Sequence, residues 1–318
     1  MQILENEPMC KHTSFKVGGP ARYFAKVESI DDLKSAFAFA REKGLSTFIL
    51  GNGTNLLVAD SGFDGVIITL AGEFSEIKDL GNGAFKVGAA TSLGRFARSA
   101  MKLGFAGIHK LAGIPGTLGG AIFMNAGAYG QEIGTCCTTV TTIDAEGSLH
   151  EHAANECGFG YRQSAFQKEI PPGSCPGQAF QAGDDMHKEI ILSATFQLPT
   201  AEGKSVADLE AELAECMAKR KASQPLNMPN AGSTFKRLEH GSAEMPTQIA
   251  PGYYIEQAGL KSYRIGGAEV STLHANFIVN AGGATASDIK QLSEVVQKKV
   301  AEKFGIELHR EIILLGNF

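Results

Sequence analysis

Apolar residues recur along this chain with two different spacings, which together predict a mixture of helices and strands. Spacings of three and four residues predict amphipathic helices over residues 29–44, from residue 92 onward, over 205–221, 253–257 and 287–304. Alternating apolar and polar residues, or short apolar runs, predict strands at residues 23–27, 47–50, 65–70, within 75–90, twice within 137–152, and at 190–198, 275–280 and 310–315.

Caps and turns indicate where several of these elements begin and end. Ser29 stands three residues before Asp32, and Ser205 three before Asp208, which is the spacing of an N-terminal cap. A turn at residues 81–83 (Gly-Asn-Gly) predicts a hairpin. The β-α-β-β pattern of the first 70 residues predicts a first lobe. Residues 168–185, rich in proline and glycine, predict an irregular surface loop.

Glycine is concentrated in two segments that suit a bound cofactor. Glycine makes up 38 of 318 residues, about 12% where about 7% is usual. In residues 107–130 (GIHKLAGIPGTLGGAIFMNAGAYG) glycines interrupt an apolar run, and GNGTN at 51–55 follows a predicted strand. Bare backbone can approach a flat or phosphorylated ligand closely, and consecutive N–H groups can form an anion-binding nest. A buried corner that serves packing alone is the alternative. Two such segments favour one pocket with two glycine walls.

Charge and composition argue against several classes of protein. The formal net charge is −5 and there is no long basic block, so we expect no nucleic-acid or anionic membrane partner. No apolar window is long enough to span a bilayer, and the first residues lack a signal-peptide core, so a cytoplasmic location is expected. The six cysteines form no CxxC pair and the eight histidines no HExxH motif. We therefore expect reduced thiols and no metal site.

Seven segments, in order along nearly the whole chain, resemble the UDP-N-acetylenolpyruvoylglucosamine reductase (MurB) family, the flavoenzymes of bacterial peptidoglycan precursor synthesis, in its shorter class. The segments are SFKVGGPAR, LGNGTNLLV, GIPGTLGGAIFMNAGAYG, YRQSAFQ, NAGSTFKR, YIEQAGLKSYRIGGAEVSTLHANFIVN and LHREIILLG. The resemblance implies an α+β protein with the FAD-binding fold of the vanillyl-alcohol oxidase type. Two FAD-binding lobes, residues 1–70 and 71–203, would precede an α+β substrate-binding lobe, 204–318, whose last strand returns to the active site.

The resemblance also implies the cofactor-binding residues. Loop 51–55 would cradle the FAD diphosphate, in agreement with the nest argument, and residues 113–127 would line the flavin. The predicted cofactor-binding residues are Gly51, Asn52, Gly53, Thr54, Asn55, Gly113, Pro115, Gly116, Thr117, Gly119, Gly120, Asn125, Ala126 and Gly127.

By the same resemblance, NADPH reduces FAD, and hydride then passes from flavin N5 to C3 of the enolpyruvyl group of UDP-N-acetylglucosamine enolpyruvate, giving UDP-N-acetylmuramate. The catalytic positions of the family fall on Arg162, Ser233 and Glu311. A guanidinium fork suits the substrate carboxylate, on which negative charge develops. Ser233 would protonate C2. Glu311 would hydrogen-bond the carboxylate as a protonated acid, which burial favours.

Four further residues fall at substrate-binding positions of the family, and one segment departs from the family pattern. Tyr161, Lys221, Arg237 and Gln257 fall at positions that contact the sugar or the uridine diphosphate in the family. Residues 168–185 interrupt a connection that is direct in the shorter class, so their role stays open. Two rival functions also stay open. One is an FAD-dependent oxidase, which would lack the catalytic set; the other is a nucleotide-sugar binding protein that has lost its cofactor.

Overall fold

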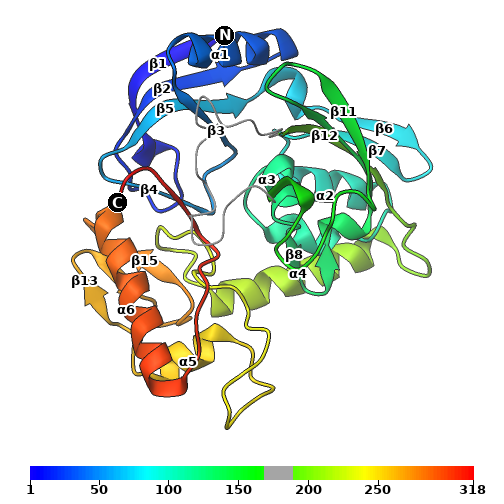
Figure 1. Cartoon of the computed structure of the whole chain (residues 1–318). Coiled ribbons are helices and arrows are strands. Elements are labelled where there is room, and N and C mark those ends of the chain that lie inside the picture. The colour runs from blue at the N-terminus through cyan, green and yellow to red at the C-terminus, as the bar shows by residue number, and fades with distance from the viewer. Residues whose placement is uncertain (168–188) are drawn as a thin grey trace.

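A four-stranded sheet with the strand order β1-β2-β5-β3 forms the first lobe (Figure 1). The computed structural model describes residues 1–167 and 189–318, so the loop predicted at 168–185 lies outside the described residues. The strands are β1 (Gln2–Pro8), β2 (Pro20–Val27), β3 (Ser46–Leu50) and β5 (Phe63–Leu70). Helix α1 (Ile30–Glu42) packs on the sheet through Leu33, Ala36 and Ala40. Its predicted cap is confirmed, because Ser29 accepts a hydrogen bond from the Asp32 N–H.

Two strands of the first lobe escaped prediction. Strand β1 lies at the edge of the sheet with every side chain exposed or half-buried, so it shows no alternating apolar pattern. Strand β4 (Leu56–Val58) has only three residues, all buried. It pairs in parallel with β16 (Ile313–Leu315) near the other end of the chain. A pairing between such distant segments leaves no local signal.

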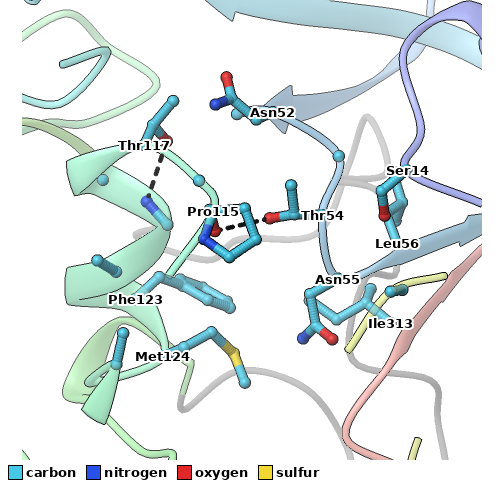
Figure 2. Close-up of a pocket in the computed structure, with 18 of the residues that line it drawn as sticks. Ser14, Asn52, Thr54, Asn55, Leu56, Pro115, Thr117, Phe123, Met124 and Ile313 are labelled. Carbon is cyan, nitrogen blue, oxygen red and sulfur yellow. Dashed lines mark hydrogen bonds between the residues drawn. The ribbon is translucent and has the colours of Figure 1, made fainter. Parts of the chain in front are cut away.

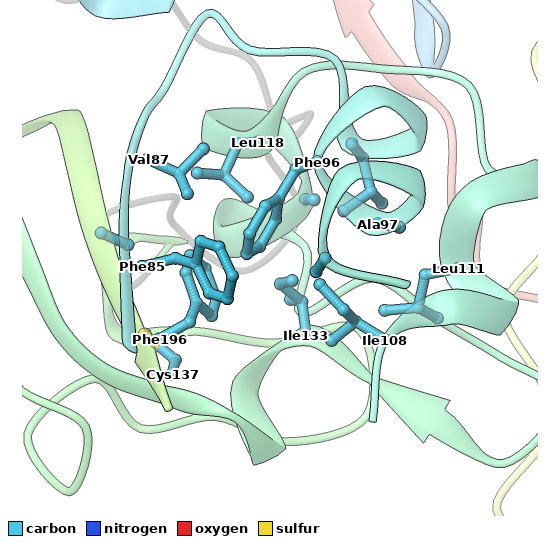
Figure 3. Packing of buried hydrophobic residues seen from close by; sticks show 14 of the residues in the cluster. Phe85, Val87, Phe96, Ala97, Ile108, Leu111, Leu118, Ile133, Cys137 and Phe196 are labelled. Carbon is cyan, nitrogen blue, oxygen red and sulfur yellow. The ribbon is translucent and has the colours of Figure 1, made fainter. Parts of the chain in front are cut away.

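A five-stranded antiparallel sheet with the order β11-β10-β12-β7-β6 forms the second lobe. Its strands are β6 (Ile77–Gly81), β7 (Ala84–Gly88), β10 (Cys137–Ile143), β11 (Leu149–Ala153) and β12 (Ile190–Gln197). The predicted hairpin is confirmed, since residues 81–83 all have positive φ at the β6–β7 turn. Phe85 and Phe196 pack around Phe96 of helix α2 (Leu93–Lys102), and this aromatic core supports helix α3 (Leu118–Phe123) (Figure 3).

Helix α4 (Val206–Ser223) packs on the second lobe, whereas the predicted division assigned residues 204–318 to the substrate lobe. Its predicted start is confirmed by a capping box between Ser205 and Asp208. Leu209 and Leu213 join the core of the second lobe, and the Tyr129 hydroxyl donates to the Cys216 carbonyl at 3.0 Å. The helix therefore carries the chain along the second lobe to the third.

The third lobe combines a three-stranded sheet with two helices. Its elements are α5 (Pro251–Gln257), β13 (Arg264–Ile265), β14 (Ala268–Val270), β15 (Ile278–Asn280) and α6 (Ala286–Phe304). Helix α6 buries Ile289, Leu292, Val296 and Val300, as the apolar spacing predicts. The chain then returns to β4 through β16, which is shorter than the predicted strand 310–315. No helix in the described ranges has both the length and the apolar character needed to cross a bilayer.

Asp60, between β4 and β5, ties the first lobe to the third. Its Oδ1 accepts from the Ala286 N–H at 2.8 Å, and its Oδ2 accepts from the Ser287 N–H at 2.9 Å and the hydroxyl at 2.7 Å. A negative charge at this end of α6 also interacts favourably with the helix dipole. Burial by itself raises the pKa of Asp60, but the hydrogen bonds from Ser287 and Ala286 outweigh it and leave the pKa lowered.

We expect Asp60→Asn to lower the free energy of unfolding at pH 7 by about 1 kcal/mol or less, since the carboxylate is partly exposed to solvent. Because its pKa is lower in the folded than in the unfolded state, the stabilisation is complete above about pH 4 and is lost as the pH falls through the folded-state pKa. Urea unfolding between pH 7 and pH 3 should show the difference narrowing. Asp64→Asn, which removes an exposed partner of Arg22, is the control. If the difference in unfolding free energy between the wild type and Asp60→Asn did not change with pH, the stabilisation by Asp60 would not be electrostatic.

Candidate active site

A cavity of about 1590 Å³ lies between the three lobes. Its walls come from β3, loop 51–55, α3, the segment that follows β11, the segment that follows α4, and Glu311 near the end of the chain. Sites for drug-sized molecules usually measure about 300–1,000 Å³. This cavity therefore has room for a dinucleotide-sized group together with part of a second ligand.

Loop 51–55 forms one wall of the cavity (Figure 2), and hydrogen bonds to three other segments hold it in place. The Thr54 hydroxyl donates to the Pro115 carbonyl of the facing wall at 3.2 Å. The Gly53 carbonyl accepts from the Ser14 N–H at 3.0 Å, and the Asn55 amide donates to the Glu311 carbonyl at 3.0 Å. Gly53 has a φ of +58°, and a Cβ there would stand 2.1 Å from the His12 carbonyl oxygen. This position therefore requires glycine.

The predicted segment 113–127 forms the facing wall, with α3 at its centre. Thr117 caps α3 by accepting a hydrogen bond from the Gly120 N–H at 3.4 Å. Figure 2 shows Phe123, the last residue of α3, and Met124, which caps the helix, on the same side of the cavity. A Cβ added at Gly120 would meet only the Thr117 hydroxyl, at 3.6 Å, so it would extend into open space. All the predicted cofactor-binding residues line the cavity except Gly113 and Asn125.

Gly113 and Asn125 lie behind this wall instead. The Gly113 carbonyl accepts a hydrogen bond from Arg220 of α4. Asn125 is only 2% exposed, and its amide donates to Glu132 at 3.0 Å and to the Gly160 carbonyl at 2.9 Å. These two residues shape the wall from its far side. A motif does not reveal which of its residues face the ligand, because that depends on how the backbone turns.

Three segments bring Arg162, Ser233 and Glu311 into the same cavity. Arg162 Nε donates to Glu311 Oε1 at 2.8 Å, and Arg162 Nη2 donates to the Gly127 carbonyl at 3.3 Å. The Glu311 N–H donates to the Thr234 carbonyl at 2.8 Å, which sets Glu311 beside the segment that carries Ser233. Arg162 has a φ of +51°, a strained backbone conformation that is concentrated at functional sites.

The carboxyl group of Glu311 stands in a largely dry environment. Burial raises the pKa of Glu311 above its usual value, and the positive charges of Arg162 and Lys236 offset this only in part. The side chain is 14% exposed, so it is not the solvated acid that a strand end usually carries. This carboxyl group therefore takes up a proton more readily than a surface glutamate.

A smaller groove of about 200 Å³ adjoins the cavity at Arg162. Tyr161 and Lys236 also line it, and Tyr161 is 42% exposed rather than packed in a strand. The Arg237 guanidinium lies 4.6 Å from the centre of the Tyr161 ring, and the Arg237 N–H donates to the Tyr161 hydroxyl at 3.2 Å. The structure thus brings Tyr161 and Arg237 together on the outer side of Arg162.

Lys221 and Gln257 line neither hollow. Lys221 is exposed on α4, and Gln257 is exposed at the end of α5, where its carbonyl accepts from Lys303 at 2.7 Å. Arg220 and Gln224 line the cavity in place of Lys221. Successive helical residues point about 100° apart, so the basic run 219–221 presents a single side chain to the cavity. Only the orientation of α4 decides which one.

The described ranges 1–167 and 189–318 contain no group of three histidine, cysteine, aspartate or glutamate side chains arranged to hold a metal ion.

Two family models match separate parts of the chain. One, described as an FAD binding domain, covers residues 21–152, and the other, the C-terminal domain of UDP-N-acetylenolpyruvoylglucosamine reductase, covers residues 224–315. The chain is 39% identical over 314 residues to the UDP-N-acetylenolpyruvoylglucosamine reductase of Carboxydothermus hydrogenoformans, a match that covers 99% of this chain and 94% of the relative. It belongs to the UDP-N-acetylenolpyruvoylglucosamine reductase (MurB) family.

Further members of the MurB family support the same assignment. The reductase of Caldanaerobacter subterraneus is 40% identical over 315 residues, covering 98% of this chain and 93% of the relative. The crystal structure of MurB from Thermus caldophilus superposes with a TM-score of 0.76 at 32% identity, covering 99% of this chain and 98% of that one. The predicted α+β FAD-binding fold with an additional C-terminal domain is thereby confirmed.

This member of the MurB family is an FAD-dependent oxidoreductase, and its cavity fits the cofactor. Two glycine-rich walls line the cavity, and a Cβ added at Gly116 or Gly120 would meet only a threonine hydroxyl of these walls. The nest-like loop 51–55 suits the diphosphate, because hydrogen bonds from the Ser14 N–H to the Gly53 carbonyl and from the Asn55 amide to the Glu311 carbonyl hold it in place. The apolar surface along α3 suits a flat ring system.

We expect Gly120→Ala to change stability and FAD binding in opposite directions. Alanine favours a helix over glycine by about 1 kcal/mol, so the flavin-free protein should be at least as stable as the wild type. The added Cβ occupies cavity space, so FAD affinity should fall about tenfold, a loss of about 1.4 kcal/mol. Thermal unfolding of the flavin-free protein and titration with FAD measure the two effects. Wild-type FAD affinity would mean that the cofactor does not lie over Gly120.

Proposed function

We propose that this cavity catalyses the reduction of the enolpyruvyl group of UDP-N-acetylglucosamine enolpyruvate, giving UDP-N-acetylmuramate, with NADPH as the electron donor. Loop 51–55 and the cavity-lining residues of the segment 115–127 would hold FAD, which would supply the redox chemistry by taking a hydride from NADPH and passing it to C3 of the substrate. The observation that carries the proposal is the convergence of Arg162, Ser233 and Glu311 at one end of a glycine-walled cavity. A cation, a hydroxyl and a buried acid are the groups that this reduction requires of the protein.

Arg162 binds the substrate carboxylate. Hydride addition at C3 leaves negative charge on C2 and on the carboxylate, and a guanidinium stays protonated while it offers two parallel donors to a carboxylate. Its contact with the Gly127 carbonyl anchors the guanidinium against the flavin-side wall. Arg162 is therefore the group that stabilises the developing charge.

Ser233 supplies the proton to C2. A serine hydroxyl is a weak acid, so it transfers a proton only to a strongly basic carbon that is held within hydrogen-bonding reach. The segment that carries it is fixed on both sides. Gly232 N–H donates to the Asn230 side chain at 2.9 Å, and Thr234 N–H donates to the Asn276 carbonyl at 2.7 Å. This rigidity supports a positioned donor.

Glu311 and the substrate carboxylate both interact with the Arg162 guanidinium. When that carboxylate takes the guanidinium fork, Glu311 loses an attractive charge, and the burial that already raises its pKa favours the protonated form. Protonated Glu311 then donates a hydrogen bond to a carboxylate oxygen, where charge accumulates during the reaction. Tyr161, in the adjoining groove, and Arg237, which packs against its ring, provide a ring and a cation for the sugar and diphosphate.

An anaerobic experiment tests the proposed function. NADPH should bleach the visible absorbance of the bound flavin, and addition of the enolpyruvyl nucleotide should restore it while UDP-N-acetylmuramate forms in equal amount. Mass spectrometry identifies the product. If the absorbance returned only when oxygen was admitted, the oxidase alternative would replace this function. A protein that cannot be reconstituted with FAD would instead support the non-catalytic alternative.

A further inference from the structure

Two buried side-chain atoms lack a hydrogen-bond partner within the described part of the chain, and both belong to residues that line the cavity. They are Ser14 Oγ and Gln224 Oε1. Leaving a buried acceptor unpaired costs about 1–3 kcal/mol, so such atoms are rare in folded proteins. Their shared location indicates that a ligand completes their hydrogen bonding. Gln224 is outside the predicted set of binding residues.

The position of Gln224 is fixed by the end of α4. Gln224 is the C-terminal cap residue of the helix, and its N–H donates to the Arg220 carbonyl at 2.9 Å. One turn earlier, the Arg220 guanidinium donates to the Gly113 carbonyl, which holds this end of α4 against the glycine wall. Ile114 and Pro115, next along that wall, line the cavity together with Gln224. The amide is therefore presented by a rigid element.

Gln224 lies toward the end of the cavity where the chemistry takes place. Residues 226–233 line the cavity without a break and lead from Gln224 to Ser233. The segment that the resemblance assigns to the flavin, residues 113–127, meets α4 one turn before Gln224, where Arg220 donates to the Gly113 carbonyl. Figure 1 shows α4 on the opposite side of the molecule from the first-lobe sheet. Gln224 therefore lies at the end of the cavity where we expect the flavin ring.

We propose that the side-chain amide of Gln224 pairs with the N3–H edge of the flavin ring. Oxidised flavin carries one ring N–H, at N3, between the carbonyl groups at C2 and C4. A primary amide complements this edge, because its oxygen accepts from N3–H while its nitrogen donates to a flanking carbonyl. The inference rests on the assignment of FAD as the cofactor.

Binding of two flavins to the flavin-free full-length protein tests the inference. FAD and FAD methylated at N3 differ in the single hydrogen that Gln224 would bind. The wild type should bind FAD at least tenfold more tightly than the methylated form. Gln224→Met, which keeps the length of the side chain and removes the amide, should bind FAD about tenfold more weakly and lose most of the preference. Fluorescence quenching on titration gives each affinity.

Ser14→Ala is the matched control, because it removes the other unpartnered atom beside Gly53, away from α4. It should weaken both flavins alike and preserve their ratio. Gln224→Glu, which retains an acceptor, should preserve a preference for FAD even where Gln224→Met folds poorly. If Gln224→Met kept the wild-type preference, or if the wild type had none, the inference would be overturned. Failure of the wild type to bind FAD would overturn the cofactor assignment instead.

Discussion

The Ser233→Ala variant is expected to bind FAD, and NADPH should bleach its flavin at the wild-type rate. Its rate of enolpyruvyl reduction, in contrast, should fall about 10²–10³-fold. Loss of one preorganised donor in an active site costs about 2.7–4 kcal/mol of transition-state stabilisation. Ser233 follows α4 in the chain and lines the cavity with Arg162 and Glu311. The predicted cofactor-binding residues that line the cavity lie instead on loop 51–55 and along residues 115–127. The reduction of the flavin by NADPH should therefore keep its wild-type rate.

Rapid mixing separates the two half-reactions of this variant. The flavin is first reduced with NADPH without oxygen, and the enolpyruvyl nucleotide is then added while absorbance is recorded. Ser35→Ala, on the exposed side of α1, is the control for an unrelated serine deletion. Reoxidation of Ser233→Ala by substrate at the wild-type rate would show that another group protonates C2.

Arg162→Lys is expected to lose at least about 10²-fold in kcat/KM despite keeping its positive charge. An ammonium cannot offer the two parallel donors of a guanidinium, and it cannot contact Glu311 and the Gly127 carbonyl through two nitrogen atoms held in one plane. Its backbone would still adopt a φ of +51°, so both side chains experience the same strain. The loss therefore reports the geometry of the fork.

Steady-state kinetics with varied enolpyruvyl nucleotide measure this effect, and NADPH bleaching confirms that the flavin half-reaction is intact. Arg237→Lys is the matched control, because this guanidinium lies over the Tyr161 ring and lines neither the cavity nor the smaller groove. It should raise KM with a smaller change in kcat. Equal effects of the two substitutions would argue against a special role of Arg162 at the reacting carboxylate.

Local sequence patterns were sufficient to predict those elements that depend on neighbouring residues alone. The caps at Ser29 and Ser205 and the hairpin turn at residues 81–83 are as predicted, because each depends on residues three or fewer positions apart. Strands β1 and β4 have no such signal. The first is an exposed edge, and the second is defined by a partner near the opposite end of the chain.

The candidate site likewise has features that the sequence predicts and features that only the fold decides. The glycine segments indicated a cofactor cavity before any fold was known, since missing Cβ atoms are a property of the residues themselves. The motif could not show that Gly113 and Asn125 face away from the cavity. Nor could it show that α4 presents Arg220 and Gln224 rather than Lys221, because one residue along a helix changes the direction of a side chain.

The sequence by itself determined the family and the FAD cofactor, and it supplied the residues proposed for the reaction, because ordered motifs preserve chemical identity along the chain. The tertiary structure alone decided that Arg162 meets Glu311 across 149 positions, and that burial raises the pKa of that acid. It also decided which face of α4 points inward. Distances and desolvation arise from packing between distant segments, and no local pattern contains them.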